Sequence, residues 1–161
     1  MILATWALAS IVTLVGITPL QAAPLTARAL AEYRLTTPVF ERFVRASRHV
    51  AEATARDARL AADPPFSREV TVLGDVAEVA PALEARFIRE PVLAAALADA
   101  GISARDYTTF ALALVGARLA HGFVKSGAMR FVPPGVASDN VAFITANEAD
   151  VAAVLMALGV E

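Results

Sequence analysis

The chain has 161 residues, which suggests a single domain, and its formal net charge at pH 7 is −2. Proteins that bind nucleic acids carry a marked basic excess, so this balance gives no reason to expect a nucleic-acid partner. The absence of cysteine excludes disulfides, thiolate catalysis, cysteine-ligated zinc and lipidation on cysteine.

The N-terminal segment has no charged side chain before Arg28. Residues 1–22 are typical of a signal peptide: a long apolar run is followed by "GITPLQAAP", and cleavage after Ala22 suits the small-residue preference at such sites. Residues 1–20 would alternatively form a membrane-spanning helix of roughly 30 Å, with Trp6 at one interface. The first interpretation predicts a periplasmic or secreted protein, and the second a protein anchored to the inner membrane. By the positive-inside rule, the arginines after a retained anchor would favour a cytoplasmic domain, which contradicts export.

Residues 23–36 are expected to form a polar connector to a helical domain at residues 37–161. Residues 28–59 hold seven arginines against four acidic residues. Such a basic segment would contact anionic headgroups or an acidic partner, or it would simply be the solvated face of a helix. Arg42 and Arg45 are therefore candidate partner contacts.

The first clear helical pattern begins at Thr37, a candidate N-cap, and continues to the break at "ADPP". Apolar residues recur along it at the spacing of one buried helix face. Ser67 is a candidate cap for a second helix, and Pro81 and Pro91 are expected to divide the chain between there and Gly101 into short segments.

The most informative helix is expected to open at Ser103, where Ser103 and Asp106 approximate a capping box. Residues 110–123 are apolar almost all round, which is typical of a helix in the middle of a bundle. A stripe of small residues, including Ala113 and Gly116, would allow another backbone to approach closely.

A last helix is predicted from Ser138 or Asp139 to Gly159, with Val141, Ile144 and Val151 among its inward residues. The pattern as a whole predicts an all-α fold, an irregular bundle of five or six helices after the N-terminal hydrophobic segment.

His49 and His121 are the first candidates for acid–base or metal chemistry. Neither helix carries the i, i+4 pair of ligands typical of metal-binding helices, and a structural role for His121 is the simpler interpretation. The sequence has no nucleophile elbow, P-loop, dinucleotide fingerprint or EF-hand loop. We therefore expect no catalytic residue, no metal site and no cofactor, and we expect that the protein is not an enzyme.

The loop "RFVPPGVASDN" is the most specific-looking stretch. Its two prolines lower the entropy cost of presenting an apolar edge, which makes Phe131, Val132, Pro133 and Pro134 candidate partner contacts, together with Trp6. The alternative is a packed connector, in which Asn140 satisfies backbone groups around the turn.

The stretches "GISARDYTTFALALVGARLAHGF" and "PPGVASDNVAFITANEADV" resemble a loose group of small, exported, all-helical bacterial proteins of uncharacterised function. The resemblance covers roughly residues 100–155. It implies a helical exported protein and brings no catalytic motif with it.

These observations predict a non-catalytic helical accessory or scaffolding subunit of a bacterial envelope complex, for which respiratory or photosynthetic membrane assemblies are a suitable setting. Its partners would be proteins of that complex, and the membrane if the N-terminal segment is retained. The alternative is a secreted helical module that binds a small apolar ligand in a cavity beside Ala113 and Gly116.

Overall fold

The computed structural model describes residues 25–66, 76–133 and 135–160, and these residues form eight α-helices and no strand. The helices are α1 (Ala27–Glu32), α2 (Thr37–Arg56), α3 (Ala58–Ala62), α4 (Val76–Arg89), α5 (Pro91–Asp99), α6 (Ala104–Lys125), α7 (Ser138–Ala146) and α8 (Glu148–Ala157). The predicted all-α class is confirmed. The N-terminal hydrophobic segment and the candidate cap Ser67 lie outside the described residues.

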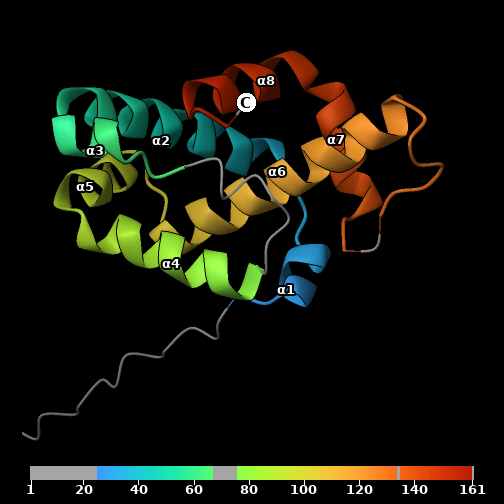
Figure 1. Ribbon diagram of the computed structural model, residues 1–161, viewed down its shortest axis with the longest axis horizontal. Helices are drawn as coiled ribbons and strands as arrows, with labels where there is room; N and C mark the ends of the chain where they lie inside the picture. Colours follow the sequence, from blue (N-terminus) through green and yellow to red (C-terminus); the bar gives the residue numbers. More distant parts are fainter. Residues whose placement is uncertain (1–24, 67–75, 134, 161) are drawn as a thin grey trace, which may run out of the picture.

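Helix α6 runs through the middle of the molecule and contacts α1, α2, α4, α5 and α7 (Figure 1). Its start has the expected capping geometry: the Asp106 backbone N–H donates to Ser103 Oγ at 3.0 Å, and that hydroxyl donates to Asp106 Oδ2 at 2.7 Å. Every side chain from Tyr107 to Leu114 is buried, as expected for a helix segment without a polar face.

Aromatic rings from α2, α4 and α6 make the centre of the core. The ring centroid of Phe43 lies 4.9 Å from that of Tyr107 and 4.9 Å from that of Phe110, and Phe87 packs edge-on against Tyr107 at 5.0 Å. All four side chains are fully buried, and each such side chain contributes roughly 1.5–3 kcal/mol through burial. Helix α2 is thereby held along one side of α6.

The number of helices exceeds the predicted five or six, partly because the long helix expected from Thr37 is broken at Asp57. The Asp57 backbone leaves the helical region, and its carboxylate accepts from the backbone N–H groups of Arg59 and Leu60 at 2.9 and 3.3 Å. A short aspartate that competes in this way for backbone donors ends one helix and caps the next.

The helix expected from Ser138 to Gly159 is divided in the same manner. Asn147 ends α7 and begins α8, and the two helices are bent by 91° at this residue. Within the described ranges, no single helix is long and apolar enough to cross a bilayer. The bent pair α7 and α8 reaches the necessary length and apolar composition only when the two helices are counted together.

Proline positions give one further correction. Pro91 begins α5, as expected, but Pro81 lies inside α4 instead of dividing it. Pro81 is exposed and sits near the start of the helix, where the loss of one backbone hydrogen bond is offset by packing of Leu83 and Phe87 against the core.

Asn140, on α7, ties the C-terminal part of the fold to the segment between α1 and α2. Its Oδ1 accepts from the Leu35 backbone N–H at 2.9 Å, and its Nδ2 donates to the Tyr33 backbone oxygen at 2.9 Å. The side chain is 2 % exposed. Asn140 therefore satisfies backbone groups more than a hundred residues away, and not those of its own turn as the sequence suggested.

Candidate functional site

The loop between α6 and α7 carries the most exposed large apolar side chain in the described part of the chain. Phe131 is 81 % exposed, and Met129 is 42 % exposed. The Met129 backbone N–H donates to the Phe123 backbone oxygen at 3.1 Å, which folds the loop back over the end of α6, where Phe123 and Val124 are each 36 % exposed. We call Phe123, Val124, Met129 and Phe131 the loop surface.

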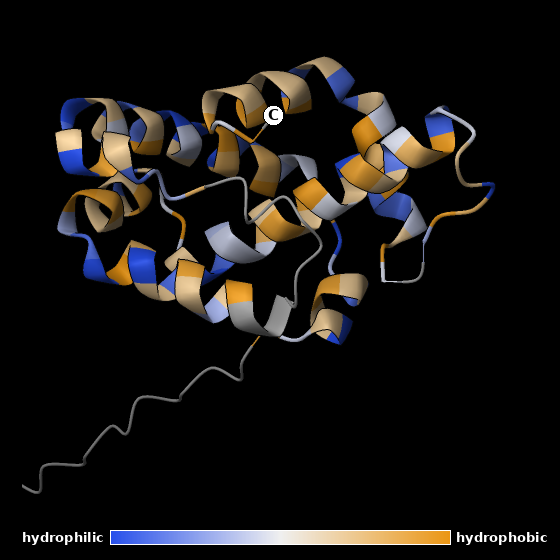
Figure 2. Ribbon diagram, viewed as in Figure 1, coloured by the Kyte–Doolittle hydropathy of each residue, from blue (hydrophilic) through white to orange (hydrophobic). Residues whose placement is uncertain are grey.

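The loop between α6 and α7, which carries Met129 and Phe131, lies at the edge of the molecule and projects beyond α7 (Figures 1 and 2). Figure 2 shows a hydrophobic stretch in this loop beside a hydrophilic residue. Between Lys125 and Asp139 the sequence has one charged residue, Arg130, which is exposed. The surface therefore combines apolar side chains with positive charge.

The predicted partner contacts fall on two elements. Phe131 is exposed, while Val132 and Pro133 are half-buried. Arg42 and Arg45 are exposed on α2, a different part of the fold. Trp6 and Pro134 lie outside the described residues. The structure thus groups Phe131 with Phe123 and Met129, which the sequence analysis did not single out although the apolar pattern of α6 continues into the loop.

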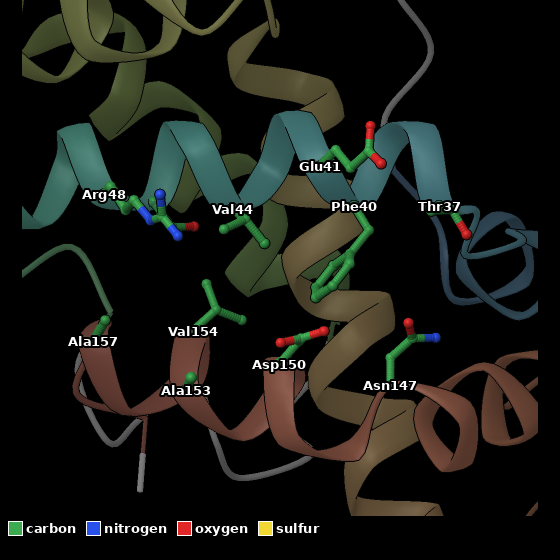
Figure 3. Close-up of a pocket in the computed structure, with 11 residues that line it drawn as sticks. Thr37, Phe40, Glu41, Val44, Arg48, Asn147, Asp150, Ala153, Val154 and Ala157 are labelled. Atoms are coloured by element: carbon green, nitrogen blue, oxygen red, sulfur yellow. The ribbon is translucent and has the colours of Figure 1, made fainter.

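A slot of about 400 Å³ lies between α2 and α8. Figure 3 shows Val44 and Val154 facing each other across its middle, with Arg48 toward Ala157 at one end and Asp150 toward Asn147 at the other. The two helices run parallel along it. The lining residues are Thr37, Phe40, Glu41, Val44, Ser47, Arg48, Asn147, Asp150, Ala153, Val154 and Ala157.

Ser47 forms part of the floor of the slot and is fully buried. Its hydroxyl lies 3.0 Å from the Tyr107 hydroxyl, so the floor is tied to the aromatic core. Burial raises the pKa of Tyr107 well above its usual value, because the phenolate would lose its hydration, and the Ser47 hydrogen bond opposes this only in part. Tyr107 is therefore a neutral structural hydroxyl.

The slot lies between α2 and α8, and not beside Ala113 and Gly116, where a ligand cavity was expected. Ala113 is buried, and a Cβ added at Gly116 would meet no atom within 4 Å. Among the described residues, no other backbone therefore approaches Gly116 closely, although the small-residue stripe predicted such an approach.

The two histidines lie in different surroundings. His49 is half-buried on α2 and lines a shallow hollow with Glu52, Asp99 and neighbouring α5 residues. His121 is 7 % exposed on α6, and its Nδ1 has no hydrogen-bond partner in the described part of the chain. Across residues 25–66, 76–133 and 135–160, no group of three or more His, Asp or Glu side chains could hold a metal ion.

An ion pair beside His121 joins the end of α6 to the start of α8. Lys125 Nζ lies 2.7 and 3.0 Å from the two carboxylate oxygens of Glu148. This hydrogen bond and the charge of Lys125 hold the pKa of Glu148 below its usual value, and the charges of His121 and Arg118 act in the same direction. The ion pair therefore joins the two helices at the surface of the molecule.

Searches against models of known protein families, against curated proteins and against solved structures found no match to this chain.

Proposed function

We propose that the protein is a non-catalytic accessory or scaffolding subunit of a bacterial envelope complex, which binds a protein partner through the loop surface. In this proposal it acts in the periplasm or outside the cell, and residues 1–20 hold it at the inner membrane where they are retained. Respiratory and photosynthetic membrane assemblies are settings that suit such a subunit.

The observation that carries the proposal is the exposure of Phe131. Burying a phenylalanine side chain contributes roughly 1.5–3 kcal/mol, yet Phe131 stays in water although 31 apolar side chains of the described residues are buried. Aromatic residues that a partner covers are among the strongest contributors to binding in protein interfaces.

The loop also limits the entropy that binding would cost. The backbone hydrogen bond from Met129 to Phe123 closes the turn, and Gly127 adopts a φ of +75° at the start of the loop. Pro133 restricts the backbone after Val132. A loop held in one shape loses less freedom when a partner covers it.

The test is copurification from native membranes in mild detergent. We expect the tagged parent chain to retain a stoichiometric protein partner and the Phe131→Ser variant to lose it. Ile88→Ser is the matched control, because Ile88 is 61 % exposed on α4, away from the loop surface. Recovery of the parent chain alone, or equal loss of the partner in both variants, would contradict the proposal.

A further inference from the structure

The slot between α2 and α8 has an apolar middle and charged ends. Val44 and Val154 face each other across it, and Phe40 closes the wall near Asp150 (Figure 3). Its volume of about 400 Å³ lies at the low end of the range for small-molecule sites. An occupant would therefore be short and have small apolar groups.

One end of the slot offers a positive charge. The Arg48 guanidinium lies in the slot toward Ala157 (Figure 3) and forms no ion pair with any described residue. A guanidinium presents paired N–H donors that match the two oxygens of a carboxylate. This end favours a carboxylate.

The other end offers acceptors. The Asp150 carboxylate also lacks an ion-pair partner among the described residues, although several surface carboxylates have one. Asn147 Nδ2 donates to the Phe143 backbone oxygen at 2.8 Å, and Asn147 Oδ1 accepts no hydrogen bond from the described residues. Thr37 Oγ1 lies on the opposite wall. The oxygens of Asp150 and Asn147 suit an ammonium, which has three donors and no acceptor.

The spacing of the two ends sets the length of the ligand. Ala157 lies at the same end of the slot as Arg48. It follows Asp150 by seven residues, or two helical turns, and seven residues at 1.5 Å each span about 10 Å. An extended peptide spans at most about 3.3–3.6 Å per residue, so three residues cover the same length.

We infer that the slot binds a tripeptide with free termini and small apolar side chains. Its ammonium lies at Asp150 and Asn147, its carboxylate at Arg48, and its side chains against Val44 and Val154. This activity is separate from docking through the loop surface.

The test is an NMR titration of the full-length chain with the tripeptide Ala-Val-Ala and its N-acetylated and C-amidated forms. Amidation removes the carboxylate charge, so we expect it to weaken binding to the parent chain by about fivefold to tenfold. In Arg48→Gln the same amidation should change the affinity by less than about twofold, because the guanidinium that pairs with the ligand carboxylate is already absent. In Asp150→Asn, N-acetylation of the ligand should likewise change the affinity by less than about twofold.

Arg45→Gln is the matched control, since Arg45 is an exposed arginine of α2 outside the slot. It should show the full amidation effect. Arg48, Arg45 and Asp150 are exposed, so all three variants should keep the circular dichroism spectrum of the parent chain. A dipeptide and a tetrapeptide should bind more weakly than the tripeptide.

Three outcomes would overturn the inference. The first is the absence of saturable shifts at α2 and α8. The second is an amidation effect of the same size in Arg48→Gln as in the parent chain. The third is binding of octanoate as tight as that of the tripeptide and indifferent to Asp150→Asn, which would identify the ligand as a fatty anion. Failure here would leave the partner test with Phe131→Ser unaffected.

Discussion

Replacing Asn140 by alanine tests the longest-range polar link in the described structure. Asn140 makes both of its hydrogen bonds to backbone groups of the segment between α1 and α2, at Leu35 and Tyr33. The substitution removes both partners at once. It leaves the buried Leu35 N–H and the half-buried Tyr33 carbonyl without their bonds.

The expected cost depends on the two orphaned groups. A buried donor or acceptor left without a partner costs about 1–3 kcal/mol. Leu35 is 7 % exposed, so its N–H has little access to water, whereas the Tyr33 carbonyl regains some hydration. We therefore expect Asn140→Ala to lower the free energy of unfolding by about 2–4 kcal/mol, a large share of the stability of a typical domain.

Urea-induced unfolding followed by circular dichroism measures this change. Thr145→Ala is the matched control on α7, because the exposed Thr145 hydroxyl bonds only to its own helix, at the Val141 oxygen 3.0 Å away. It should cost well under 1 kcal/mol. A change for Asn140→Ala within about 0.5 kcal/mol of the parent chain would refute the reasoning.

Asn140→Asp adds a pH signature to the same link. The new carboxylate would place a charged oxygen against the Tyr33 carbonyl, so burial should raise its pKa above that of an unfolded aspartate. Stability is then retained below the unfolded pKa and lost as pH rises through the folded pKa. The variant should approach the parent chain in acid and fall away from it at neutral pH. A deficit independent of pH would contradict the assignment of Nδ2 to Tyr33.

Three further predictions concern stability. Ser47→Ala should cost about 1–3 kcal/mol in urea unfolding because it orphans the Tyr107 hydroxyl, and adding Tyr107→Phe should recover much of that loss. Arg59 hydrogen-bonds to Glu90 at 2.6 and 3.0 Å and holds the Glu90 pKa below its usual value, so Arg59→Gln should destabilise the protein at neutral pH. Its deficit should shrink as pH falls through the folded pKa of Glu90, as unfolding midpoints measured from neutral to acid pH would show. Pro81→Ala should restore a backbone donor inside α4 and raise Tm, by about 2–4 °C for each kcal/mol gained.

The parts of the fold that sequence predicts well are those that local patterns determine. The absence of a polar face between Phe110 and Phe123 requires burial on all sides, and α6 is the central helix. The Ser103 cap and the helix start at Pro91 depend on groups within one turn. In each case, the residues that determine the structure are close together in the chain.

The helix breaks were missed because the hydrophobic pattern continues across them. Asp57 and Asn147 lie between apolar residues that keep helical spacing, so periodicity alone predicts one helix in each place. Both residues have short polar side chains that compete for neighbouring backbone groups. Which of the many such residues ends a helix depends on what the next segment packs against.

The loop surface was predicted in part, because Phe131 beside two prolines is a local signal. The slot was not predicted, since it joins Arg48 to residues about a hundred positions later. No spacing within either helix indicates that α2 and α8 lie parallel.

The origin of the slot lies in the bend at Asn147. A continuous helix from Ser138 to Ala157 would carry Asp150 away along the axis of α7, whereas the 91° bend lays α8 along α2. The bend is held locally. The Asn147 backbone N–H and Nδ2 both donate to the Phe143 backbone oxygen, while the Asn147 backbone oxygen accepts from the Val151 N–H at 2.9 Å. Asn147, which the helical pattern does not mark as a break, thus places the acidic end of the slot at Asp150 opposite the basic end at Arg48. For this reason the candidate ligand site is visible only in the three-dimensional arrangement.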